Sequence, residues 1–353
     1  MRSSAVGGGI GAAVPSIARR AAVFGGVIAS AAMAAAHAAP MPRYSVISRI
    51  AGPGGGWDYA TIDTSVDRLY LARDAGVLAM DLKDHRIAPL AIKGEGVHIA
   101  EPVGDTGLVL VTNGDANTVT IFEAKSNRVT GTVKVGSAPD GAVYDPSTKL
   151  VAVMRHRGGT VSLVDAKRAS LVRTIRVGGE LESAAPSGDG TLYVNVASAH
   201  QVAVLDLNAG KVLHRYVLKG CMDPSGLAYD AADRLIASVC GNGVTKILRA
   251  ASGKEIASLR TGLGSDGLIW DAARKLLFVP AAGKQALTVI ALAPRGATVL
   301  QRLTTGSGAR LGALDPKTGL LYLPSARFGP PRSPKGWPTV IPGTFRFIVV
   351  GRR

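Results

Sequence analysis

The sequence predicts an all-β fold: a closed, seven-bladed β-propeller with four antiparallel strands in each blade. Three observations lead to this prediction. The chain repeats with a period of about 42 residues, apolar and polar residues alternate within each repeat, and a spare strand near the N-terminus can complete the last repeat. The hydrophobic share of 47%, together with 44 Gly and 19 Pro, supplies the many short strands and turns that such a ring needs.

Each repeat is marked by a strand centred on a Leu that is followed by another apolar residue. The markers are Leu69-Tyr70, Leu108-Val109, Leu150-Val151, Leu192-Tyr193, Leu235-Ile236, Leu277-Phe278 and Leu321-Tyr322. Successive markers lie 39 to 44 residues apart, which is the length of one four-stranded blade.

The other strands of each repeat follow the same pattern. A polar turn such as Asp145–Thr148 precedes the marker, and an alternating strand such as Val161–Val164 follows it. Alternation with period 2, bounded by Gly, Asp, Pro and Asn, is typical of strands joined by hairpins. Beyond the N-terminal segment, the chain shows no helical periodicity.

The two ends of the repeat region predict how the ring closes. The seventh repeat supplies strands at 311–314, 320–323 and 345–350 and lacks a fourth. A strand over Tyr44–Ile50 precedes the first repeat and can fill that place. We expect it to complete the last blade, because this pairing removes two exposed sheet edges at once.

The N-terminal segment predicts export. Residues 1–38 contain Arg2, Arg19 and Arg20, an apolar run over Ala21–Ala36 and an A-x-A pattern at Ala36-His37-Ala38. These are the parts of a cleaved secretory signal peptide. A retained transmembrane helix is the alternative, but the run is shorter than the ~20 residues that span a bilayer. We therefore expect a periplasmic protein of a Gram-negative bacterium, with residues 39–353 as one propeller domain and no membrane span after cleavage.

The chain is strongly basic. Its formal net charge is +16, and loss of the three leader arginines would leave +13. Attraction to nucleic acid or another polyanion is one interpretation. Because the basic residues are scattered, a solvated basic surface is the other. Aromatic residues make up only 5% of the chain, which argues against stacking platforms for single-stranded nucleic acid.

One repeat resembles a known propeller family. The segment Leu108–Ile121, LVLVTNGDANTVTI, resembles the YVTN repeat, and Val135–Gly141 resembles the turn between its blades; Leu192–Asn195 is a degenerate second copy. The resemblance is closest to YncE-like periplasmic proteins and implies their fold and compartment, without a shared catalytic set. Trp-Asp, the mark of WD40 repeats, occurs only at Trp57-Asp58 and Trp270-Asp271, outside the third strands, which disfavours a WD40 protein.

The loops that precede the blades predict a site at the mouth of the central channel. Read in order, they carry Asp58, Glu95, Asp140, Glu182, Asp223, Asp266 and Arg310. Crowded carboxylates repel one another unless a cation offsets them, so these residues form a candidate site for a divalent cation, another metal or an amine. The alternative is that Asp before Gly caps a tight turn, as at Asp140-Gly141 and Asp266-Gly267.

The loops between second and third strands share that face and form an outer rim. They carry Arg73, Arg155, His156, Arg157, His200 and Arg327. The segment Arg155-His156-Arg157 is a candidate for holding phosphate or carboxylate through bidentate contacts. The alternative is a solvated loop. A Pro-rich insertion at about 326–343 is expected to be extended and to act as a lid or docking loop, with Trp337 beside Trp57; the alternative is a surface insertion without a role.

Cys221 and Cys240 are the two cysteines of the chain. They fall at the same end of two antiparallel strands of the fifth repeat, so in an oxidising compartment we expect a disulfide. No H-E-x-x-H, H-x-H or C-x-x-C spacing occurs, and a zinc site is not supported by motif.

Three functions remain open from the sequence. The first is a monomeric binding or protein-interaction scaffold whose ligand or partner contacts the channel mouth. The second is a propeller enzyme that depends on a divalent cation, lactonase-like or quinoprotein-like, which rests on fold analogy alone. The third is electrostatic binding of nucleic acid or a polyanion. No G-x-S-x-G elbow, P-loop or haem-attachment motif is present.

Overall fold

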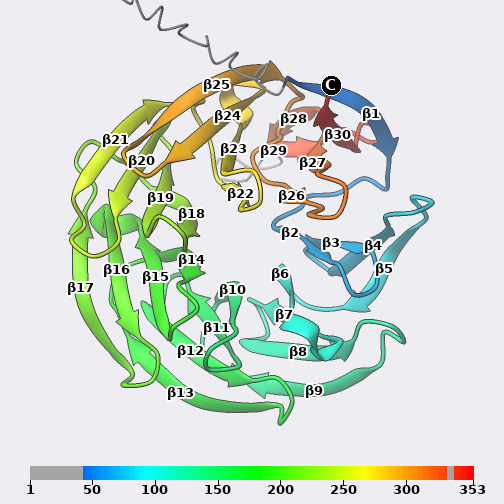
Figure 1. The fold of residues 1–353 in the computed structure, drawn as a ribbon. Helices are drawn as coiled ribbons and strands as arrows, with labels where there is room; N and C mark the ends of the chain where they lie inside the picture. The colour runs from blue at the N-terminus through cyan, green and yellow to red at the C-terminus, as the bar shows by residue number, and fades with distance from the viewer. Residues whose placement is uncertain (1–42, 332–337) are drawn as a thin grey trace, which may run out of the picture. The chain divides into compact units, whose positions relative to one another are not determined.

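Seven four-stranded antiparallel sheets are arranged in a ring in the computed structural model, which describes residues 43–331 and 338–353 (Figure 1). The predicted seven-bladed β-propeller is confirmed. The predicted leader, residues 1–38, lies outside the described residues. Within the described ranges, no helix has the length and apolar character needed to cross a membrane.

The strands of the blades run in chain order from the channel outwards. Blades 1 to 3 consist of β2 (Ala60–Asp63), β3 (Arg68–Arg73), β4 (Gly76–Asp81) and β5 (Ile87–Lys93); β6 (Val97–Pro102), β7 (Leu108–Asn113), β8 (Thr118–Glu123) and β9 (Val129–Lys134); β10 (Pro139–Asp145), β11 (Leu150–Arg155), β12 (Thr160–Asp165) and β13 (Ser170–Arg176).

Blades 4 to 6 repeat this order. They consist of β14 (Leu181–Pro186), β15 (Thr191–Val196), β16 (Gln201–Asp206) and β17 (Lys211–Val217); β18 (Pro224–Asp230), β19 (Leu235–Cys240), β20 (Val244–Arg249) and β21 (Glu255–Arg260); β22 (Ile269–Asp271), β23 (Leu276–Ala281), β24 (Ala286–Ala293) and β25 (Gly296–Thr304). Three short 3-10 turns lie beside the strands: η1 (Gly104–Thr106), η2 (Ala197–Ala199) and η3 (Ala282–Lys284).

Blade 7 closes the ring with a strand from the other end of the chain. Its order is β26 (Ala313–Leu314), β27 (Leu321–Ser325), β30 (Arg346–Arg352) and, outermost, β1 (Tyr44–Ala51). β1 pairs antiparallel with β30 from Tyr44↔Arg352 to Ala51↔Arg346. The predicted N-terminal closure is therefore confirmed.

A side-chain clasp adds to this closure. Gln301, on the outer strand β25 of blade 6, accepts a hydrogen bond from the backbone N–H of Tyr44 and donates one to its carbonyl, both 2.8 Å long. The Tyr44 ring packs edge-on against Phe278 of the same blade, with ring centroids 5.0 Å apart. The N-terminal strand is thus fixed to two blades.

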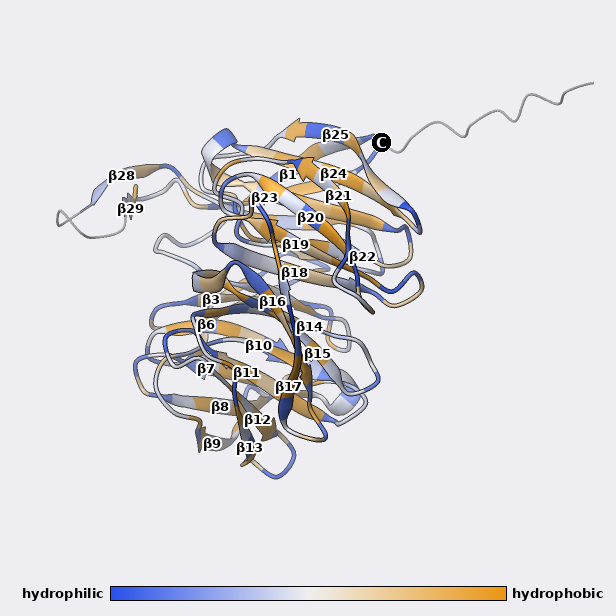
Figure 2. Ribbon diagram, turned by 90° about the vertical axis from the view of Figure 1, so that its left-hand side faces the viewer, coloured by the Kyte–Doolittle hydropathy of each residue, from blue (hydrophilic) through white to orange (hydrophobic). Residues whose placement is uncertain are grey.

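The core consists of apolar layers between neighbouring blades. One layer, for example, joins Met154 and Leu163 of blade 3 to Leu181, Val194 and Leu205 of blade 4. Because both faces of a blade pack against its neighbours, the middle strands are buried on both faces, and every residue of β19 and β23 is buried. Figure 2 shows this apolar interior along the strands, with polar residues in the loops.

Buried aspartates end the first strands of four blades and directly follow the first strand of blade 7. They are Asp63, Asp145, Asp230, Asp271 and Asp315. Their carboxylates accept hydrogen bonds from the following turn, as Asp145 does from the N–H and hydroxyl of Thr148. Each carboxylate accepts at least one hydrogen bond inside an Asx-type turn, although Oδ1 of Asp145 has no partner among the described residues.

The Pro-rich insertion forms a short two-stranded hairpin instead of a purely extended loop. β28 (Phe328–Pro331) pairs with β29 (Pro338–Val340), and Figure 2 shows the pair extending beyond the ring of blades. At its base, the ring of Phe328 lies 5.7 Å from that of Trp57. The predicted lid residue Trp337 lies outside the described residues.

Candidate functional site at the channel mouth

The register of the innermost strands places one residue of each blade at the same position beside the channel. The first residues of β6, β10, β14 and β18 each pair with the last residue of the following strand, as Pro139 does with Arg155. The next residue along each of these strands lies beside the channel. In blades 1, 6 and 7, the equivalent residue precedes the buried aspartate of the blade by the same separation as Asp140 precedes Asp145. We call these seven residues the mouth ring: Asp58, His98, Asp140, Glu182, Ser225, Asp266 and Arg310.

Two residues predicted for this ring lie elsewhere. Glu95 is three residues ahead of His98, is exposed, and lines a different cavity with Lys93 and Asn113. Asp223 is two residues ahead of Ser225, and it is exposed in a left-handed turn with φ of +49°. The loops that precede the blades differ in length, so a carboxylate near the end of such a loop does not reach the same position in every blade.

Three side chains from three blades meet at the mouth. The carboxylate of Asp58 lies 2.8 Å from Nδ1 of His98, and that nitrogen lies 3.8 Å from the carboxylate of Asp140. One potential ligand atom from each residue lies within 4.8 Å of the other two. Two carboxylates and one imidazole are a donor set that binds divalent transition metals.

Burial makes the charge state of this cluster unusual. Burial, with the neighbouring charges of Asp58 and Glu182 added, raises the pKa of Asp140 to about 7, although His98 and His156 oppose the shift. Burial alone would lower the pKa of His98, but its hydrogen bond to Asp58 and the charge of Asp140 raise it on balance. Near neutral pH, Asp140 is therefore partly protonated, since its pKa is about 7.

Two ion pairs flank the cluster. Nδ1 of His156 lies 3.0 Å from the Glu182 carboxylate, and this hydrogen bond raises the pKa of His156 to about 9. Asp266 lies 3.1 Å from Nε of Arg310, yet burial outweighs this pairing and raises the pKa of Asp266 to about 6. His156, predicted for the outer rim, thus belongs to the mouth.

Next to the ring, a hydrogen bond joins blades that are not neighbours. The hydroxyl of Tyr59 in blade 1 lies 3.1 Å from that of Ser183 in blade 4. Burial raises the pKa of Tyr59 well above its ordinary value, and the charges of Glu182 and Asp140 add to the shift. The phenol therefore stays neutral and acts as a hydrogen-bonding group between blades 1 and 4.

Glu101 is a further carboxyl group at the inner strands. It follows His98 by three residues on β6, and its Oε1 accepts a hydrogen bond of 3.0 Å from the backbone N–H of Tyr144 in blade 3. Burial raises its pKa to about 7 and outweighs the effect of this hydrogen bond. No cation lies within ion-pair distance of it in residues 43–331 and 338–353.

We expect Glu101→Gln to stabilise the protein above neutral pH and to change little near pH 4. Because the pKa of Glu101 is raised in the folded state, the contribution of its protonated form to the free energy of unfolding is fully present below the unfolded-state pKa. This contribution is lost as the pH rises through about 7, where the buried carboxyl group ionises. Gln keeps the acceptor oxygen without the charge, so the variant should gain on the order of 2 kcal/mol at pH 8. Urea unfolding at both pH values measures this difference.

The exposed variant Glu95→Gln is the control and should follow the wild-type protein at both pH values. Equal stability of Glu101→Gln and wild type at pH 8 would show that Glu101 is solvated when ionised.

Most residues of the predicted outer rim have structural contacts. Arg73 lies over the Phe345 ring, 4.2 Å from its centroid, and donates to the carbonyls of Pro53, Gly55 and Gly56. Burial lowers its pKa to about 10. Arg73 therefore holds the loop that carries Trp57, rather than pointing at a ligand.

The other rim residues differ in their surroundings. Arg155 donates to the Ser137 carbonyl and hydroxyl and to the Thr160 hydroxyl. Arg157 and Arg327 are exposed. His200 ends the turn η2 in the left-handed conformation, with φ of +52°.

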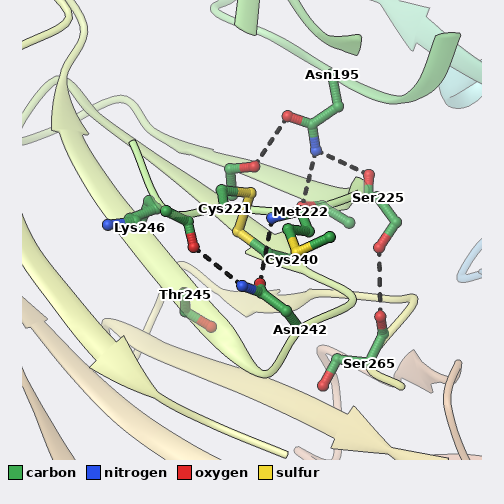
Figure 3. The surroundings of a disulfide bond; sticks show 12 residues. Asn195, Cys221, Met222, Ser225, Cys240, Asn242, Thr245, Lys246 and Ser265 are labelled. Atoms are coloured by element: carbon green, nitrogen blue, oxygen red, sulfur yellow. Dashed lines mark hydrogen bonds between the residues drawn. A yellow bond between two sulfur atoms is a disulfide. The ribbon is translucent and has the colours of Figure 1, made fainter. Parts of the chain in front are cut away.

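The predicted disulfide is confirmed. Cys221 and Cys240 are bonded, with Cα atoms 5.4 Å apart, and both are buried (Figure 3). Asn242 ties the loop beside the bond by accepting from the N–H of Met222 at 3.2 Å and donating to the Gly220 carbonyl at 3.0 Å. The disulfide bond fixes the loop that precedes blade 5, and Ser225 of the mouth ring follows this loop.

Sequence reasoning missed four polar members of the site: His98, Ser225, Glu101 and Tyr59. A usable signal existed. Each ring residue precedes the Leu marker of its blade by about ten residues, so counting back from the markers finds His98 and Ser225. Neither the Tyr59–Ser183 contact nor the burial of Glu101 follows from spacing.

Comparisons with known proteins support the fold. No family model matches the chain, and no curated protein matches it. Similar solved structures include the RRP9 WD40 repeats (TM-score 0.74, 11% identity, covering 88% of this chain and 100% of that chain). A chain of the Mitotic Checkpoint Complex gives a TM-score of 0.71 at 14% identity, with 87% and 96% covered.

A chain of the hydrazine synthase of Kuenenia stuttgartiensis is also similar, with a TM-score of 0.68, 18% identity and 79% and 95% covered. At these identities the likeness is one of fold. The YVTN-type family indicated by Leu108–Ile121 stays a prediction, and the chain is, on structure, a seven-bladed propeller of the WD40-like shape.

Proposed function

We propose that this protein is an exported, periplasmic binding protein that uses the channel-mouth face as its interaction surface and takes a divalent cation at the mouth. One observation carries the proposal: Asp58, His98 and Asp140 place their potential ligand atoms within 4.8 Å of one another. The propeller fold fits a scaffold or interaction role, since its loops present one broad surface on a rigid ring.

The charge balance of the mouth supports a cationic ligand. Four carboxylates of the ring share the mouth with Arg310, His98 and His156. Within the described residues, the half-buried Asp140 has one ion-pair partner, the imidazole of His98, which it shares with Asp58. Ionisation of Asp140 is costly without a further positive charge, as its raised pKa shows. A bound divalent cation removes this cost, because it favours the carboxylate over the acid.

The proposed compartment rests on two features. The disulfide between Cys221 and Cys240 is typical of oxidising environments. The basic, apolar and small-residue parts of residues 1–38 form a signal-peptide pattern. A YncE-like periplasmic protein agrees with both.

Cation binding is tested by calorimetric and thermal-shift titration of residues 39–353 with Zn²⁺, Mn²⁺, Ca²⁺ and Mg²⁺. We expect at least one of the ions to bind and to raise the melting temperature, and Asp58→Asn with Asp140→Asn to abolish both effects. Because the ion competes with the proton on Asp140, affinity should rise between pH 6 and pH 8.

The matched control is Glu95→Gln with Asp223→Asn, which removes two carboxylates of the same face that lie outside the mouth ring. This variant should bind like wild type. If no ion binds, or if the control loses binding equally, the mouth is not a metal site.

A further inference from the structure

A cavity opens on the mouth face between blades 3 and 4, and its lining is basic, whereas the mouth ring is mainly acidic. Its volume is about 630 Å³, and none of its lining residues belongs to the mouth ring. Three arginines, Arg155, Arg157 and Arg176, line it, with Glu180 as its single acidic residue. We call this cavity the arginine pocket.

The arginines keep their charge available. Arg155 is held in place by three neutral acceptors, on Ser137 and Thr160. Arg157 and Arg176 are exposed, and within residues 43–331 and 338–353 no carboxylate lies within ion-pair distance of either. Guanidinium groups without a carboxylate partner bind oxyanions through paired N–H donors.

Glycine backbone forms the rest of the wall. A Cβ on Gly158 would lie 2.9 Å from the guanidinium carbon of Arg155, and one on Gly179 would lie 2.8 Å from the hydroxyl oxygen of Ser198. Gly179 also has a φ of +77°, which disfavours any other residue. Side chains at these positions would fill the pocket, so the glycines keep it open and expose peptide groups to its contents.

The arrangement is particular to blade 3. Its hairpin between second and third strands reads Arg-His-Arg-Gly-Gly at 155–159, whereas that of blade 4 reads Val-Ala-Ser-Ala-His at 196–200 and that of blade 5 Cys-Gly-Asn-Gly at 240–243. The basic cluster is therefore not a by-product of the repeat.

We propose that the arginine pocket binds a phosphate group, as inorganic phosphate or as part of a phosphate monoester. A dianion suits three guanidinium groups set against one carboxylate, and phosphate presents oxygens to several paired donors at once. The pocket works independently of the cation at the mouth.

The test is titration of residues 39–353 with sodium phosphate and with glycerol 3-phosphate at constant ionic strength in chloride, followed by calorimetry and melting temperature. Wild type should bind, whereas Arg157→Gln with Arg176→Gln should bind at least about tenfold more weakly, since two charge-assisted contacts are lost. Glu180→Gln should bind several-fold more tightly, a gain that a merely structural role would not produce.

Arg260→Gln is the matched control, because Arg260 pairs with Val244 in blade 5 as Arg176 pairs with Thr160 in blade 3. It should leave phosphate binding unchanged. Equal binding of both compounds supports a monoester, and binding of phosphate alone supports the free ion. Asp58→Asn with Asp140→Asn, which changes the mouth ring, should leave phosphate binding intact. The proposal is overturned if wild type binds neither compound, or if Arg260→Gln loses as much phosphate affinity as the pocket variant.

Discussion

A chain that starts at residue 52, and therefore lacks β1, should fail to fold into a soluble ring. Blade 7 would lose its outer strand, and the full backbone edge of β30 would be exposed, as would the ring of Phe278 against which Tyr44 packs. An unpaired edge of that length is a template for aggregation. Size-exclusion chromatography and circular dichroism, with a chain that starts at Arg43 as the control, measure this effect.

A graded version of the same experiment keeps the strand and weakens its attachment. Tyr44→Ala removes a buried aromatic side chain and should cost about 3–5 kcal/mol, whereas Gln301→Ala removes only the clasp and should cost about 1–2 kcal/mol. A soluble chain without β1 that melts cooperatively at the parent temperature would refute closure by this strand.

Loss of the disulfide should also lower stability strongly. Cys221→Ser with Cys240→Ser opens a covalent loop with a sequence separation of 19, which corresponds to about 3 kcal/mol by loop entropy. For a domain of this size, that is a fall in melting temperature of about 5 °C. Differential scanning calorimetry of both proteins gives the value.

A reducing agent provides the control for this experiment. It should lower the melting temperature of the wild-type protein towards that of the double variant and leave the variant unchanged. If reductant and substitution both leave the melting temperature in place, the loop before blade 5 is held by Asn242 and its backbone contacts alone.

The ring, its blade number and its closure follow from the sequence because they depend on a repeated pattern. The Leu markers set the blades apart, and an incomplete seventh repeat requires a strand from elsewhere. The loops before the blades carry no such regularity: register shifts in β6, β10, β14 and β18 and differences in loop length hide which residue reaches the channel. Counting from the sequence and the positions in the structure agree for Asp58, Asp140, Glu182, Asp266 and Arg310, whereas Glu95 and Asp223 lie three and two residues ahead of the ring positions His98 and Ser225.

Contacts between blades were harder to predict than positions within them. His98 meets Asp58 and Asp140 across three repeats, and no local spacing motif connects residues some 40 positions apart. The arginine pocket could be predicted in part, because Arg155 and Arg157 stand in one hairpin, but Arg176 joins them only through the pairing of β12 with β13. The insertion pairs as a hairpin, since prolines at strand ends and edges leave enough backbone donors for a short ladder.

Arg43, the first described residue, and Arg353 lie side by side, since the N–H of Arg353 donates to the carbonyl of Arg43 at 2.7 Å. β30 starts beside the hairpins of the mouth face and runs away from them, so Arg43 and Arg353 lie on the opposite face. An affinity tag attached after Arg353 will therefore leave the channel mouth and the arginine pocket facing the solution. For the same reason, the protein can be fused to another domain at the face opposite the mouth while its mouth-face loops stay free to bind a ligand.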